Sequence, residues 1–167
     1  KPARVGLRVD ISRLPSVEHT IFGRRARVQQ LTDAWSDSRC SLLSIVAPGG
    51  TGKTALVNHW LYGMKNDHEQ PWGGADAVFA WSFYSQGADA SRRVSSEQFI
   101  HEAMRCLELP DPGPISPWDK GQRLAEGLRA QRVLLVLDGL EPLQEPPGTD
   151  GRAGFLRDHS VSSLIRA

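Results

Sequence analysis

Apolar residues along the chain follow two different spacings, which alternate from one end of the sequence to the other. Positions three and four residues apart share one face of a helix. This spacing predicts helices over residues 24–38, 53–64, 95–107 and 119–131 and in a short segment after 154. Short continuous apolar runs predict buried strands over residues 41–47, 77–84 and 133–137. Alternating helices and buried strands indicate a parallel sheet covered by helices, so we expect an α/β fold.

The remaining segments lack a regular apolar spacing and are expected as connections. Residues 1–20 contain two prolines and little periodicity, which favours a linker or an extended lead-in. Residues 109–117 contain four prolines, and residues 141–154 are rich in Pro and Gly, so both are predicted to be loops. A length of 167 residues fits one domain of common size, and we assign residues 21–167 to it.

Composition and charge narrow the classes of protein to consider. Hydrophobic residues make up 40% of the chain, charged residues 23%, and the net charge is +1, which gives no case for nucleic acid or an anionic membrane as partner. No apolar run reaches the ~18 residues of a membrane span, and residues 1–4 lead into no signal peptide, so the cytosol is the expected location. Cys40 and Cys106 are expected as buried small side chains, with a disulfide as the alternative.

A glycine-rich loop follows the apolar run at 41–47, with the sequence Ala-Pro-Gly-Gly-Thr-Gly-Lys-Thr over residues 47–54. It matches the phosphate-loop pattern G-x-x-x-x-G-K-[ST] except that Ala47 replaces the first glycine. Glycines allow the turns that aim backbone N–H groups at a phosphate, and the next helix adds its positive dipole end. The sequence therefore predicts phosphate binding by Pro48, Gly49, Gly50, Thr51, Gly52, Lys53, Thr54 and Ala55.

Chemical roles follow for four residues of this predicted site. Lys53 would reach the β- and γ-phosphates, and the Thr54 hydroxyl would ligate Mg²⁺. Asp138 follows five apolar residues and would hold Mg²⁺ through its water shell; the alternative is that it begins an Asp-Gly turn. Glu141 is the candidate to orient or deprotonate the attacking water, and the alternative is an exposed loop glutamate.

With both motifs in view, the sequence resembles the STAND class of P-loop ATPases, the signal-transduction ATPases that include the NACHT and NB-ARC proteins of apoptosis and innate immunity. Four stretches carry the resemblance: Ile-Phe-Gly-Arg at 21–24, the Walker A element at 47–56, Ala-Trp-Ser-Phe-Tyr-Ser-Gln-Gly at 80–87, and the Walker B element at 134–144. The Walker motifs are shared with many ATPases, and the upstream Phe-Gly-Arg element narrows the choice. The stretches at 80–87 and 116–121 resemble bacterial members in particular.

The resemblance implies a three-layer α/β P-loop NTPase fold of the AAA+/STAND type. Its five-stranded parallel sheet would have the fourth strand between the first and the third, and that strand would follow Ala167. Residues 21–167 would then be the N-terminal part of a nucleotide-binding domain. In such proteins the backbone of the upstream element lies against adenine, so Phe22, Gly23 and Arg24 are expected to do so here.

The same resemblance implies a function and a set of partners. ATP or ADP with Mg²⁺ would set a switch, with slow hydrolysis of ATP. ATP binding would permit homo-oligomerisation and activate an upstream effector domain, and a sensor or repeat domain would lie downstream, as in bacterial antiviral defence. One departure is that the NACHT-type acidic pair is reduced to Glu141 followed by Pro142.

Two other functions stay open. A nucleic-acid-handling AAA+-like ATPase shares the upstream Gly-Arg, but it should bring a basic module, and Arg92-Arg93 is expected as a solvated loop. A nucleotide sensor that does not hydrolyse would use the same P-loop. GTP is disfavoured because no Asn-Lys-x-Asp element occurs in the chain.

Overall fold

The computed structural model describes residues 6–16, 21–84, 92–146 and 153–167. The chain divides into two compact units. Pro15–Gly74 form the loop-helix unit, and Lys1–Leu14 together with Ala75–Ala167 form the sheet unit.

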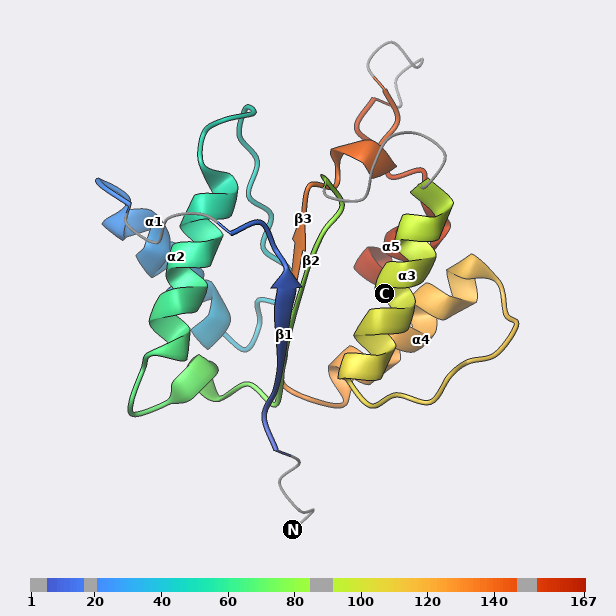
Figure 1. The fold of residues 1–167 in the computed structure, drawn as a ribbon, viewed down its shortest axis with the longest axis horizontal. Helices are drawn as coiled ribbons and strands as arrows, with labels where there is room; N and C mark the ends of the chain where they lie inside the picture. Colours follow the sequence, from blue (N-terminus) through green and yellow to red (C-terminus); the bar gives the residue numbers. More distant parts are fainter. Residues whose placement is uncertain (1–5, 17–20, 85–91, 147–152) are drawn as a thin grey trace. The chain divides into compact units, whose positions relative to one another are not determined.

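The sheet unit is built on three parallel strands in the order β1-β2-β3 (Figure 1). These are β1 (Arg8–Arg13), β2 (Ala77–Ser82) and β3 (Val133–Asp138). The β2–β3 ladder runs without a break from Ala77 opposite Val133 to Ser82 opposite Asp138, whereas the β1–β2 ladder is irregular between Asp10 and Arg13. The expected parallel α/β sheet is thus present. Within the described chain, the second edge of β3 has no strand partner.

Strand β1 lies in a segment for which the sequence predicted only a linker or lead-in. Polar Arg8 and Asp10 alternate there with apolar Val9 and Ile11, which is the two-residue period of a strand. Side chains tie this edge strand to the rest of the unit. Arg8 forms an ion pair of 3.3 Å with Glu108, and the Arg13 guanidinium lies 5.1 Å from the centroid of the Trp81 ring.

The core of the sheet unit lies between the sheet and three helices on one of its faces (Figure 1). The helices are α3 (Arg92–Cys106), α4 (Pro117–Arg129) and α5 (His159–Arg166). Alternate residues of a strand share a face, so Phe79, Trp81 and the following Phe83 point together into this core. They meet Phe99 of α3, with ring centroids 5.6 to 6.2 Å from its ring. Burying these aromatic side chains stabilises the packing of α3 on β2.

Helices α4 and α5 approach closely because of a glycine. A Cβ on Gly121 would lie 2.1 Å from the carbonyl oxygen of Ser160, closer than any real contact. The Ser163 hydroxyl donates a hydrogen bond of 2.8 Å to the carbonyl of Trp118. Small residues at the crossing therefore bring the two backbones together.

The loop-helix unit contains α1 (Arg25–Ser36), α2 (Lys53–Lys65) and the short turn η1 (Pro71–Gly74). The two helices agree with the periodicity of the sequence. Tryptophan N–H groups fix their packing: Trp60 donates to the Thr32 hydroxyl at 3.1 Å, and Trp35 donates to the Gly73 carbonyl at 3.0 Å. The buried apolar side chains of this unit are Leu31, Leu56, Trp60, Leu61, Met64 and Trp72.

The strand predicted over residues 41–47 is wrong. These residues are irregular, and Leu42 and Val46 are 63% and 89% exposed. A strand is stable only when its N–H and C=O groups pair with a neighbour, and no strand of the described chain pairs with this run. The apolar run before the glycine loop is therefore exposed.

The cysteines also differ from the expectation. Both are free thiols, but Cys40 is exposed and Cys106 is only half-buried. A separate finding concerns membranes: no helix in the described part of the chain has the length and apolar character needed to cross one.

Candidate functional site

The glycine loop of the loop-helix unit leads directly into α2, whose N-cap is Gly52. Gly50 and Gly52 have φ angles of +76° and +78°, in the left-handed region that other residues enter only with strain. The N-cap residue Gly52 has no side chain that could accept from the N–H groups of the first turn. The local sequence thus forms a turn of backbone amides at the N-terminus of α2, which is the positive end of the helix dipole.

Lys53 folds back over this loop. Its ammonium group donates hydrogen bonds to the carbonyls of Ala47 at 2.8 Å and Pro48 at 3.2 Å. The Thr51 hydroxyl also donates to the Pro48 carbonyl, at 2.8 Å. Side chains of the loop therefore hydrogen-bond to carbonyls at its start. The Lys53 side chain is long enough to reach across the loop.

The upstream Phe-Gly-Arg element contacts this loop within the same unit. The Arg24 guanidinium donates a hydrogen bond to the Thr51 carbonyl. Its Nη2 atom lies 3.7 Å from the position that a Cβ would take on Gly52. Gly23 turns the chain with a φ of +68°, and the Phe22 side chain is 88% exposed. The structure thus brings two of the predicted binding elements together, through a side-chain contact that the sequence did not predict.

In the sheet unit, Asp138 is the last residue of β3 and lies opposite Ser82, the last residue of β2. Residues opposite each other in a parallel ladder share a face, so both side chains project from the face away from the aromatic core. The Phe83 N–H donates to the Asp138 carbonyl at 2.9 Å, and Gly139 turns the chain with a φ of +66°. Asp138 therefore ends a strand and also begins an Asp-Gly turn.

Ser82 adds a polar group that the sequence analysis did not use. Its side chain is fully buried, and among the described residues its Oγ has no hydrogen-bond partner. A buried hydroxyl without a partner is uncommon because it loses its hydration without compensation. It follows that the carboxyl ends of β2 and β3 present a hydroxyl and a carboxylate on one face.

Glu141 is exposed and is the first residue of the 3₁₀ turn η3 (Glu141–Leu143). The buried Leu143 anchors this turn in the core of the sheet unit. Tyr84 lies just after β2. Partial burial raises the pKa of Tyr84, and the neighbouring carboxylates of Glu141 and Asp138 raise it further. Glu141 and Asp138 therefore both raise the pKa of the same group, the Tyr84 hydroxyl.

Tyr84 is the residue that sequence reasoning missed. A Cβ on Gly139 would lie 2.2 Å from Cδ2 of the Tyr84 ring, so the ring rests directly on the glycine. The only signal was that Tyr84 falls within the Ser-Phe-Tyr-Ser-Gln stretch, which also contributed to the resemblance. Local periodicity cannot show that this ring lies beside the strand end at Asp138.

The predicted site residues thus form two groups, one in each unit. Phe22, Gly23 and Arg24 lie with the glycine-loop residues of the loop-helix unit. Asp138 and Glu141 lie with Ser82 and Tyr84 in the sheet unit.

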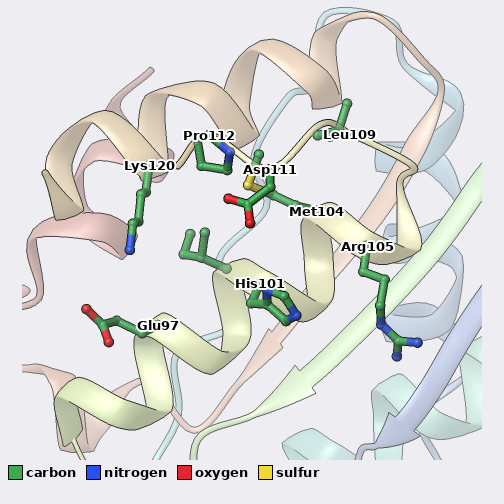
Figure 2. A pocket seen from close by; sticks show the side chains of 9 residues that line it. Glu97, His101, Met104, Arg105, Leu109, Asp111, Pro112 and Lys120 are labelled. Atoms are coloured by element: carbon green, nitrogen blue, oxygen red, sulfur yellow. The ribbon is translucent and has the colours of Figure 1, made fainter. Parts of the chain in front are cut away.

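A separate pocket of about 240 Å³ lies between α3, α4 and the loop that joins them (Figure 2). Apolar side chains such as Met104 and Leu109 line it together with charged ones of both signs, among them Glu97 and Lys120. None of the residues predicted to bind nucleotide or metal lines this pocket. We therefore assign it no part in the candidate site. Across the described ranges, no three His, Cys, Asp or Glu side chains gather as a metal site would require.

Comparisons of the chain with protein-family models, with curated proteins and with solved structures found no match. The functional interpretation therefore depends on the motifs and on the contacts described above.

Proposed function

We propose that this chain binds ATP or ADP with Mg²⁺ and acts as the nucleotide-binding part of a signalling switch of the STAND type. The conformation of the glycine loop is the observation that carries the proposal. Left-handed Gly50 and Gly52 lead into a helix end without a side-chain cap, and Lys53 lies across the loop. Those features suit a polyphosphate, since backbone amides, a helix dipole and an ammonium group all favour negative charge.

The residues present fit the nucleotide and its metal. Residues 48–55 would hold the phosphates through main-chain N–H groups, and Lys53 would exchange its loop carbonyls for phosphate oxygens. Thr54 and Asp138 offer the oxygen ligands that Mg²⁺ prefers. When bound, the ion would neutralise charge on the β- and γ-phosphates.

The upstream element would complete the nucleotide site. Phe22, Gly23 and Arg24 are proposed to lie against the adenine ring. The Arg24 contact with the loop supports this, because it puts the element beside the residues that would hold the phosphates. The high exposure of Phe22 leaves its ring accessible to a base.

ATP hydrolysis is proposed to use Asp138 and Glu141. Glu141 would take a proton from the attacking water, and Asp138 would help hold the metal. A nucleotide sensor without hydrolysis is the second candidate, and one observation favours it. Pro142 follows Glu141 directly, where the related proteins would have a second acidic residue.

The finer fold is also part of the proposal. A P-loop NTPase sheet would have a further strand beside β3. The absence of a strand partner on the second edge of β3 in the described chain supports this. Hydrogen exchange on a chain extended beyond Ala167 would test it, with added protection expected along β3.

The wider role comes from the resemblance alone. Exchange of ADP for ATP in the cytosol would allow homo-oligomerisation and activate an attached effector domain. A downstream sensor or repeat domain would supply the cue.

Fluorescent ADP and ATP analogues would test nucleotide binding. Lys53→Ala should weaken it at least tenfold, because it removes the ammonium group from the phosphate site. Lys65→Ala is the matched control, since Lys65 is exposed at the other end of α2 and should leave affinity unchanged. Equal affinity in both variants would contradict the proposal. Salt-dependent binding of DNA without nucleotide binding would favour the nucleic-acid-handling class instead.

A further inference from the structure

We propose that the pocket between α3 and α4 is a second binding site, which takes a small zwitterion with an apolar side chain, such as a free α-amino acid of the size of leucine (Figure 2). The Lys120 ammonium group would bind the carboxylate of the ligand, and the Glu97 carboxylate would bind its ammonium group. The pocket shares no residue with the predicted nucleotide site, so binding there is independent of the function proposed above.

One face of α3 forms the apolar floor of the pocket. Glu97, Ile100 and Met104 are spaced by three and four residues, so they lie on the same face of this helix. Ile100 and Met104 are only 2% and 6% exposed, whereas Glu97 is exposed one turn before Ile100. The floor therefore has a carboxylate at one end.

The loop between α3 and α4 forms a wall of the pocket and is held in place by its own contacts. Leu109 lies against α4, with its Cδ1 2.2 Å from the position of a Cβ on Gly127. The Asp111 carboxylate accepts a hydrogen bond of 2.9 Å from the Gly113 N–H. Residues 110–114 contain three prolines, which restrict the backbone further. A wall with little freedom loses little entropy on binding a ligand.

Two opposite charges face each other at one end of the pocket. In Figure 2 the ends of the Lys120 and Glu97 side chains point toward one another, from α4 and α3. Among the described residues neither side chain takes part in an ion pair, whereas Arg105 is paired with Glu102 at 2.6 Å. The ammonium group of Lys120 and the carboxylate of Glu97 are thus both available to a ligand that carries the opposite charges.

Size and charge together select the class of ligand. At about 240 Å³ the pocket is smaller than the roughly 300–1,000 Å³ of sites for drug-sized molecules. An α-amino acid carries both its charges on one carbon, and its side chain points away from them onto the apolar floor. A phosphate would bind Lys120 but would be repelled by Glu97, and a purely apolar molecule would pair with neither charge.

Methyl NMR on the whole chain tests the proposal with an internal control. The chain has two methionines, and both are buried: Met104 lines the pocket, and Met64 lies on α2 in the other unit. With ¹³C-methyl-labelled methionine, L-leucine should shift the Met104 signal with a Kd on the order of 1 mM and leave the Met64 signal in place. The Met104→Leu variant assigns the signals. No saturable shift at about ten times this concentration, or equal shifts of both signals, would overturn the proposal.

Two analogues of leucine test each charge without any substitution in the protein. Leucinamide lacks the carboxylate, and 4-methylpentanoate lacks the ammonium group, so each should bind about tenfold more weakly than leucine. Analogues that bind as tightly as leucine would show that the pocket does not recognise a zwitterion.

Variants then assign each charge to its residue. Lys120→Gln should weaken binding of leucine about tenfold and leave that of leucinamide unchanged. Glu97→Gln should weaken binding of leucine and leave that of 4-methylpentanoate unchanged. Arg123→Gln is the matched control, because Arg123 is exposed on the same helix as Lys120 and does not line the pocket. Equal losses of leucine affinity in Lys120→Gln and Arg123→Gln would contradict the assigned role of Lys120.

Discussion

Arg24 donates a hydrogen bond from its guanidinium to the main-chain carbonyl of Thr51, and this contact joins the turn before α1 to the glycine loop before α2. The same guanidinium lies over Gly52, with Nη2 3.7 Å from where a Cβ would be. One arginine side chain therefore braces the loop that would hold the phosphates.

Arg24→Ala should weaken binding of a fluorescent ADP analogue about fivefold. The expected cause is a less ordered loop, because one hydrogen bond to it contributes about 1 kcal/mol. Hydrogen exchange should become faster over residues 48–52. Arg25→Ala provides the control, since Arg25 is the exposed first residue of α1. An equal loss of affinity in the two variants would argue against a bracing role.

Gly52→Ala and Gly63→Ala should change the free energy of unfolding in opposite directions. Gly52 has a φ of +78° and its nearest heavy atom is 3.7 Å from the added Cβ, so alanine fits but costs about 1–2 kcal/mol in backbone strain. Gly63 lies inside α2 with open space around it, where alanine should stabilise the helix by about 0.5–1 kcal/mol. Urea unfolding followed by circular dichroism would measure both. A Gly52→Ala variant as stable as the wild type, or more stable, would show that the φ of Gly52 is not needed.

Gly121→Ala should destabilise the sheet unit by about 1–3 kcal/mol, because the added methyl group meets main chain at the crossing of α4 and α5. The Ser160 carbonyl, 2.1 Å from the new Cβ, can retreat only if a helix moves. Gly127→Ala is the comparison: its methyl group would meet the tip of Leu109, a side chain that can change rotamer. Thermal unfolding should therefore show the larger loss for Gly121→Ala, and the reverse order would contradict this packing.

The two thiols should differ in alkylation rate. Cys40 is exposed and should react readily with iodoacetamide. Burial raises the pKa of Cys106, and the charge of Asp10 adds to this, so less of its reactive thiolate exists at a given pH. Its alkylation should thus be slower and should keep accelerating above pH ~8.5, where an ordinary cysteine is already half ionised. Mass spectrometry of Cys40→Ser and Cys106→Ser variants would measure each rate, and equal rates would refute the burial of Cys106.

The predictions that succeeded were those in which local pattern and packing agree. Trp60, Leu61 and Met64 follow a helical spacing, and all three are buried on α2. The apolar runs of β2 and β3 each have a parallel partner, so their expected boundaries held to within two residues. The glycines at 50 and 52 were also informative about the turn, because their conformational freedom is a local property that is visible in sequence.

The predictions that failed depended on distant partners. The run at 41–47 is as apolar as a buried strand, but pairing requires a neighbour that periodicity cannot supply. Strand β1 was overlooked because its alternation is short and polar. The contacts of Arg24 with Thr51 and of Tyr84 with Gly139 join residues far apart in the chain, so no spacing rule could have revealed them.

The uncovered run before the glycine loop also affects how copies of the chain behave toward one another. Its seven residues, 41–47, carry no charge and no proline and are rich in Leu, Ile and Val, which is the composition of segments that stack between molecules as cross-β pairs. The purified chain would then aggregate mainly in response to a high protein concentration, more than in response to heating. A single gatekeeper charge, as in Ile45→Lys, is the smallest change that would oppose such stacking while leaving the turn at Gly50 and Gly52 untouched.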